Sequence, residues 1–79
     1  MARTRGTLTK RFGLVLREAR LKAGLTQEQL AHRSGVHPTY VSQVERGLLS
    51  PTLTKLEVIA AALGTRPHQL LRAAERVDT

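Results

Sequence analysis

The sequence predicts a small all-α protein built from five short helices. Apolar residues recur at steps of three and four along most of the chain, which is the spacing of a helix with one buried face. Glycine or proline separates the periodic segments and marks where one helix ends and the next begins. No segment alternates between polar and apolar residues with the period of two that a half-buried strand requires.

The beginning of the chain is basic and has no apolar period. We therefore expect a flexible basic arm over residues 1–8 and a single domain over residues 9–79. Two arginines of this arm, Arg3 and Arg5, either are solvated or contact a polyanion. From about residue 8 the spacing is helical, and one apolar stripe contains Phe12, Leu16, Ala19 and Ala23.

The next two helices are short and are separated by a tight turn. Thr26 begins the first of them as an N-cap, and Gln29 stands three residues later, where a capping box needs it. Gly35 ends this helix, and Pro38 opens the next, which runs to about Arg46. A two-turn helix, a glycine turn and a second short helix together describe a helix-turn-helix.

The last two helices carry the apolar residues from which we predict the assembly. An inward stripe of the fourth helix contains Leu53, Leu56, Ile59, Ala60 and Leu63. Pro67 opens the fifth helix, whose apolar residues are Leu70, Leu71, Ala74 and Val77. A four-helix core this small cannot cover both apolar edges of the fifth helix. We therefore expect a symmetric homodimer through these four residues and adjoining parts of the fourth helix.

Composition and charge restrict the function. The chain has 13 basic and 6 acidic residues and a net charge of +7, which favours a polyanionic partner. It has no cysteine, which excludes disulfides and thiolate metal sites, and its three histidines lack the spacing of a metal site. No segment is long and apolar enough to span a bilayer or to act as a signal region. We expect a cytoplasmic protein without a cofactor.

The third predicted helix has one apolar side and one polar side. Val41 and Val44 point into the core together because they lie three residues apart. The opposite side displays Thr39, Ser42, Gln43 and Arg46. A solvated surface would explain this polar side equally well, but the helix-turn-helix pattern favours DNA. Glutamine can bond adenine twice, and threonine offers thymine a hydroxyl and a methyl group. We therefore expect base contacts from Thr39, Ser42 and Gln43.

Three sequence blocks resemble the Xre/Cro family of phage-repressor-type helix-turn-helix proteins: GLTQEQLA at 24–31, YVSQVERG at 40–47 and LEVIAAALG at 56–64. Within that family the chain is most similar to the small controller proteins of restriction–modification systems. The resemblance implies that Gln27 binds a DNA phosphate, and that Tyr40 and Arg46 lie at the wall or edge of the groove. It also implies a structural ion pair between Arg20 and Glu45, which bridges the first and third helices.

The chain departs from the family pattern at two places. Pro38 replaces a polar residue that reads a base in many members, so one base contact is missing. The following loop is often basic in the family but is apolar at Leu48 and Leu49, which we expect to fold into the core. Thr52 and Lys55, at the start of the fourth helix, are then the candidates for contacts with the DNA backbone.

Together these features predict a regulator that binds double-stranded DNA sequence-specifically, as a homodimer on a palindromic operator. Control of a restriction–modification system is the narrower expectation. The alternative is an antitoxin of the same fold, whose main partner is a toxin protein; a third possibility is a nucleoid protein without sequence preference. No nucleophile–base pair, carboxylate dyad or phosphate-cradling glycine loop occurs, which argues against an enzyme. We expect no small-molecule effector.

Overall fold

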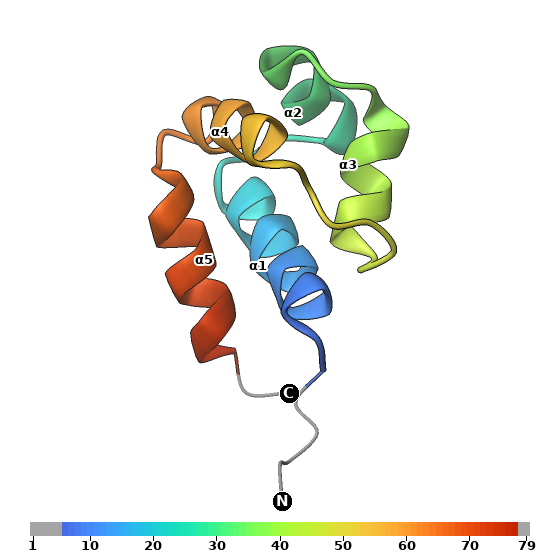
Figure 1. Cartoon of the computed structure of the whole chain (residues 1–79). Coiled ribbons are helices and arrows are strands. Elements are labelled where there is room, and N and C mark those ends of the chain that lie inside the picture. Colours follow the sequence, from blue (N-terminus) through green and yellow to red (C-terminus); the bar gives the residue numbers. More distant parts are fainter. Residues whose placement is uncertain (1–5, 78–79) are drawn as a thin grey trace, which may run out of the picture.

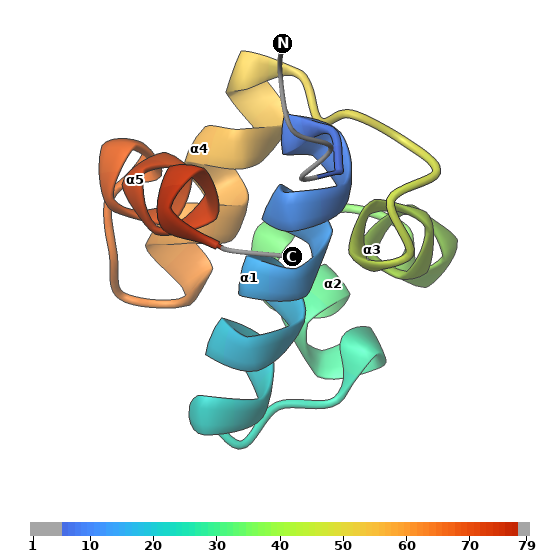
Figure 2. The ribbon, with the colours of Figure 1, turned by 90° about the horizontal axis from the view of Figure 1, so that it is seen from below.

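The first helix, α1, is the element against which two other helices pack from opposite sides. The computed structural model describes residues 6–77, which form α1 (Leu8–Lys22), α2 (Gln27–Ser34), α3 (Pro38–Glu45), α4 (Leu53–Ala62) and α5 (Pro67–Arg76). No strand occurs among these residues. α3 and α5 flank α1 (Figure 1), and the view from below shows the same arrangement (Figure 2). α2 packs against α3 and α4. The predicted all-α, five-helix fold is confirmed.

Threonine hydroxyls fix the starts of three helices. The side chains of Thr7, Thr26 and Thr52 each accept a hydrogen bond from the backbone N–H three residues later, at 3.0–3.1 Å. Such a cap satisfies one of the N–H groups that a helix leaves unpaired at its first turn. α1 therefore begins at Leu8, one residue inside the stretch predicted as a flexible arm. Arg3 and Arg5 lie outside the described residues.

The core contains the predicted apolar stripes, with exceptions at helix ends and in one loop. Leu56, Ile59 and Ala60 of α4 are buried as predicted. Leu53, however, is 82% exposed, because it is the first residue of α4 and projects past the edge of the core. Ala23, at the C-cap of α1, is also exposed. In the loop before α4, Leu49 packs against the core while Leu48 is 66% exposed, so the prediction was wrong for Leu48.

α5 is fixed along α1 by its apolar face and by an arginine. Leu70 and Ala74 are buried in the core of the subunit itself, so they are not available to a partner, contrary to our prediction. Leu71 and Val77 are only partly buried. Nη1 of Arg11 donates to the carbonyl oxygens of Ala74 and Glu75 at 3.2 and 3.4 Å. These carbonyls belong to the last turn of α5, where a cation is favourable and helical partners are missing.

Gly13 allows α1 and α3 to approach each other closely. It is buried in the middle of α1. A Cβ atom at this position would lie 2.4 Å from the carbonyl oxygen of Val44 and 2.6 Å from that of Glu45. Both are backbone atoms, so only a shift of a whole helix could relieve the contact. The spacing between α1 and α3 therefore depends on the absence of a side chain at residue 13.

We predict that Gly13→Ala destabilises the fold by about 1–3 kcal/mol, because overpacking a tight contact forces the backbone to shift. The sign is diagnostic, since the same change in an uncrowded helix interior stabilises by about 0.5–1 kcal/mol. Urea unfolding measures the difference, with Arg17→Ala at an exposed position of α1 as the matched control. A Gly13→Ala variant that is more stable than the wild type would show that the two helices have room to spare.

Candidate nucleic-acid interface

The end of α1, the start of α2 and the start of α3 line an open groove. The capping box at Thr26 and Gln29 is complete: the Gln29 side chain accepts from the Thr26 N–H at 2.8 Å, and the Thr26 hydroxyl accepts from the Gln29 N–H at 3.0 Å. Gly35 ends α2 with a φ of 72°, a left-handed conformation that glycine adopts without strain. The groove, of about 710 Å³, lies between the start of α2 and α3.

The burial pattern of α3 separates its two sides. Val41 and Val44 are completely buried, which confirms the predicted core side. On the other side Thr39 is exposed, and Ser42 and Gln43 are half-buried. Thr39 and Ser42 line the groove together with Gln27, whereas Gln43 and the exposed Arg46 continue the polar side of α3 beyond it. Arg46 is the C-cap residue of α3.

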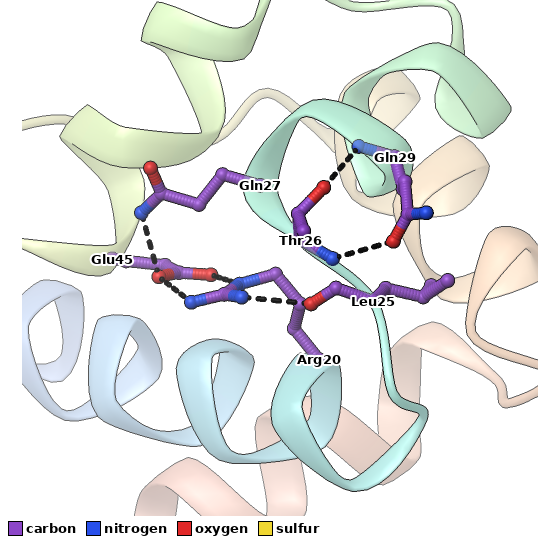
Figure 3. Close-up of polar contacts among 6 residues, drawn as sticks. All are labelled: Arg20, Leu25, Thr26, Gln27, Gln29 and Glu45. Carbon is purple, nitrogen blue, oxygen red and sulfur yellow. Dashed lines mark hydrogen bonds and ion pairs between the residues drawn. The ribbon is translucent and has the colours of Figure 1, made fainter.

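A buried ion pair joins α1 to α3 (Figure 3), and its arginine also lines this groove. Arg20 donates to the carboxylate of Glu45 through Nε at 2.6 Å and through Nη2 at 3.1 Å. Its Nη1 donates to the carbonyl oxygen of Leu25 at 2.8 Å, in the segment that leads into α2. The guanidinium fork is thus bonded on two sides, and this two-point geometry is the strongest that an arginine and a carboxylate can form.

Gln27 extends this network to α2. Its Nε2 donates to Oε1 of Glu45 at 3.0 Å. The orientation of the amide follows from chemistry, because a carboxylate only accepts hydrogen bonds and so requires the nitrogen end. The amide oxygen consequently points away from Glu45 (Figure 3). An oxygen cannot bond a phosphate oxygen, so a phosphate contact from Gln27 has to use the second Nε2 proton or the backbone N–H.

The remaining predicted contact residues lie outside the groove. Tyr40 is half-buried, its ring packs against the core, and its hydroxyl is buried without a hydrogen-bond partner in the structure. Thr52 is exposed and caps α4, and Lys55 is half-buried one turn later.

The polar contacts that the sequence did not predict include Gln27 to Glu45 and a histidine cap at His37, because both depend on how side chains turn in space. The signal for the second was a polar residue directly before Pro38, the usual place of an N-cap.

The described residues do not assemble a metal site or a membrane segment. Residues 6–77 hold no group of three or more His, Cys, Asp or Glu side chains that could bind a metal ion. In the same range no helix is long and apolar enough to cross a membrane.

A short helix that is packed across α2 and turns a polar side outward, on a basic chain, defines a helix-turn-helix DNA-binding regulator. The family model described as helix-turn-helix matches residues 16–70, and the chain belongs to this family. The resemblance to the Xre/Cro type is thereby confirmed. The chain is a helix-turn-helix transcriptional regulator.

The proteins similar in sequence to this chain include control proteins. Control protein C.BamHI from Bacillus amyloliquefaciens is 43% identical over 61 residues, which cover 76% of this chain and 75% of that protein. Several other curated relatives are longer, and the chain spans 36–56% of their length.

Among solved structures, the restriction–modification controller protein C.AhdI from Aeromonas hydrophila matches with a TM-score of 0.76 at 43% identity, over 80% of this chain and 94% of that one. The clp gene regulator ClgR from Corynebacterium glutamicum matches with a TM-score of 0.88 at 29% identity, over 99% of this chain and 100% of that one. These relatives are named as regulators, not as enzymes.

We predict that Arg20→Met and Glu45→Leu each destabilise the fold by about 3 kcal/mol, because each leaves one buried charge without its partner. The double variant should lose less than the sum of the two, since no unpaired charge remains. Urea unfolding of the four proteins gives the coupling free energy. Additive losses would contradict an energetic role for the contact seen in the structure.

Proposed function

We propose that the protein binds double-stranded DNA sequence-specifically, as a homodimer on a palindromic operator. It regulates transcription either by blocking a promoter or by recruiting the transcription machinery to it. The observation that carries the proposal is the phase of α3: buried Val41 and Val44 turn Thr39, Ser42 and Gln43 away from the core. The net charge of +7 supplies attraction to phosphates. This mechanism requires no chemical step. A protein that acts in this way works where the DNA is, which we propose to be the cytoplasm.

We assign the contacts by their position on the helix-turn-helix. The N-terminal part of a recognition helix enters the major groove most deeply, so Thr39 and Gln43, one turn apart, are the main base readers, with Ser42 beside them. Gln27 and Arg46 contact the backbone or the edge of the groove, and Tyr40, whose hydroxyl is buried, does so through the part of the residue that stays exposed. Thr52 and Lys55, at the start of α4, contact the backbone as well.

We further propose that the regulated genes belong to a restriction–modification system. The support is the similarity to a control protein and to a controller protein, each 43% identical to this chain. The neighbouring genes test this narrower role directly, since a methyltransferase and an endonuclease gene should lie beside the gene of such a controller. A toxin gene in that place would favour an antitoxin instead.

Selection from random oligonucleotides with the purified protein should yield an inverted repeat.

Gln43→Ala should then weaken binding to that operator by about 1–3 kcal/mol with little effect on random DNA, because it loses a contact with a base edge. It should relax the preference at one base pair per half-site. Competition against all single-base changes of the operator measures this, with Arg46→Ala, which should lose affinity on every sequence, as the comparison. If Ser42→Ala changes the profile and Gln43→Ala does not, the helix enters the groove rotated by about 100°.

The homodimer that we propose uses an exposed apolar surface formed by α4, α5 and the start of α1. Leu53 projects from it between two grooves. One groove, of about 140 Å³, is lined mainly by Leu8, Phe12, Pro51, Leu56 and Leu71. The other, of about 400 Å³, lies between α4 and α5 and includes Glu57, Pro67, His68 and Leu71. Leu53 itself lines both grooves, and a projecting side chain beside a hollow suits a two-fold contact, because each copy must supply both halves.

We predict that Leu53→Asp gives a folded monomer, because it places a charge on the surface that a second copy would bury. The stability of the subunit itself, measured at a concentration where the wild type is also monomeric, should change little, since the side chain is 82% exposed within the subunit. Sedimentation at tens of micromolar, with and without operator DNA, measures the assembly. Leu14→Asp, an exposed leucine elsewhere on α1, is the matched control and should remain dimeric. A Leu53→Asp variant that still dimerises, or a wild type that is monomeric in both conditions, would contradict the proposed surface.

A further inference from the structure

α3 begins with an unusual cap, a histidine. His37 is exposed and has the extended backbone of an N-cap residue, with φ −75° and ψ 144°. Its Nδ1 accepts a hydrogen bond from the backbone N–H of Thr39 at 3.1 Å. Serine, threonine, aspartate and asparagine are the common residues at this position. The cap function alone therefore does not require an imidazole ring.

The cap determines which ring nitrogen carries the proton. A nitrogen that accepts a hydrogen bond has no proton of its own, and a neutral imidazole has one proton in all. The proton must therefore be on Nε2, at the far end of the ring. The side chain is exposed, so this N–H is available as a donor to a group outside the protein.

The backbone at the start of α3 has no such donor left. Pro38 carries no N–H. The N–H of Thr39 is bonded to His37 Nδ1, and the N–H of Tyr40 is bonded to the carbonyl oxygen of His37 at 2.9 Å. In many helices these first N–H groups bind an anion directly. Here the imidazole ring accepts a hydrogen bond from one of these N–H groups, that of Thr39, and offers its own Nε2–H as a donor farther from the helix.

We infer that His37 donates a hydrogen bond from Nε2 to a DNA phosphate at the edge of the recognition helix; this inference rests on the proposed function. A phosphate suits the site better than a base edge does. The ring offers a single donor and no free acceptor, so it cannot make the paired contacts that distinguish bases. The partial positive charge at the start of α3 also favours an anion there.

The decisive variant is His37→Ser, which retains a strong N-cap but removes the ring donor. His37→Asn, another strong N-cap, is measured alongside it, so that the result does not depend on one variant. His37→Ala removes both the cap and the donor. His32→Ala, which replaces an exposed histidine of α2, is the matched control. Each protein is titrated with the selected operator and with random DNA between about 50 and 200 mM salt, and is also melted thermally.

We expect His37→Ser and His37→Asn to melt like the wild type but to bind both DNAs about 10-fold more weakly per protomer, as for a lost hydrogen bond to a charged group. The slope of log affinity against log salt should stay close to that of the wild type, because a neutral imidazole releases no counterion from the phosphate. His37→Ala should show the same loss of affinity and a lower melting temperature, and His32→Ala should show neither.

Wild-type affinity in His37→Ser would show that the histidine is only a cap and would overturn the inference. A changed base preference would also overturn it, in favour of a contact with a base edge. Both outcomes leave the proposed function intact. A wild type that binds neither DNA would contradict the proposed function itself, and this inference with it.

Discussion

The position of α3 depends on one buried carboxylate. Glu45, at the last turn of α3, receives two hydrogen bonds from Arg20 of α1 and one from Gln27 of α2. Arg20 also holds the carbonyl of Leu25, just before α2 begins. Three segments of the chain are thereby tied to a single side chain. Because DNA recognition requires α2 and α3 to meet the duplex together, this group of bonds sets the geometry of the candidate interface.

This network serves to select one arrangement of α3 on α1 more than to raise the net stability of the fold. Burying two opposite charges costs desolvation energy that their attraction barely repays, and well-packed apolar residues of similar size can be as stable. An apolar substitute, however, would allow α3 to slide or rotate on α1 at little cost. Directional bonds to Glu45 allow one arrangement, and Gly13 permits the close contact that this arrangement needs. Together they specify the distance and the rotation of α3.

Much of the fold could be predicted because its signals are local. Helix spacing, the capping box at Thr26 and the left-handed Gly35 are read from neighbouring residues, and the structure confirms them. The errors concern relations between distant elements. Leu70 and Ala74 were expected at a dimer contact because helix periodicity shows which residues share a stripe but not which helix covers it. In the same way Leu53 has the spacing of a core residue and still lies beyond the edge of the core. The sequence places Gly13 inside a predicted helix, but it does not show that α3 packs directly against this residue.

The first turn of α4 brings two proposed roles within a few residues of each other. Thr52 and Lys55 are assigned to the DNA backbone, while Leu53 is assigned to the contact between copies. When one rigid turn takes part in both events, any effect of DNA on the binding of the second copy is matched by an equal effect of the second copy on the binding of DNA. Under the proposed dimerisation, operator occupancy at low expression rises with the square of the protein concentration. The operator would therefore stay almost unoccupied until enough protein accumulates, and its occupancy would then rise more steeply than it would for a monomer.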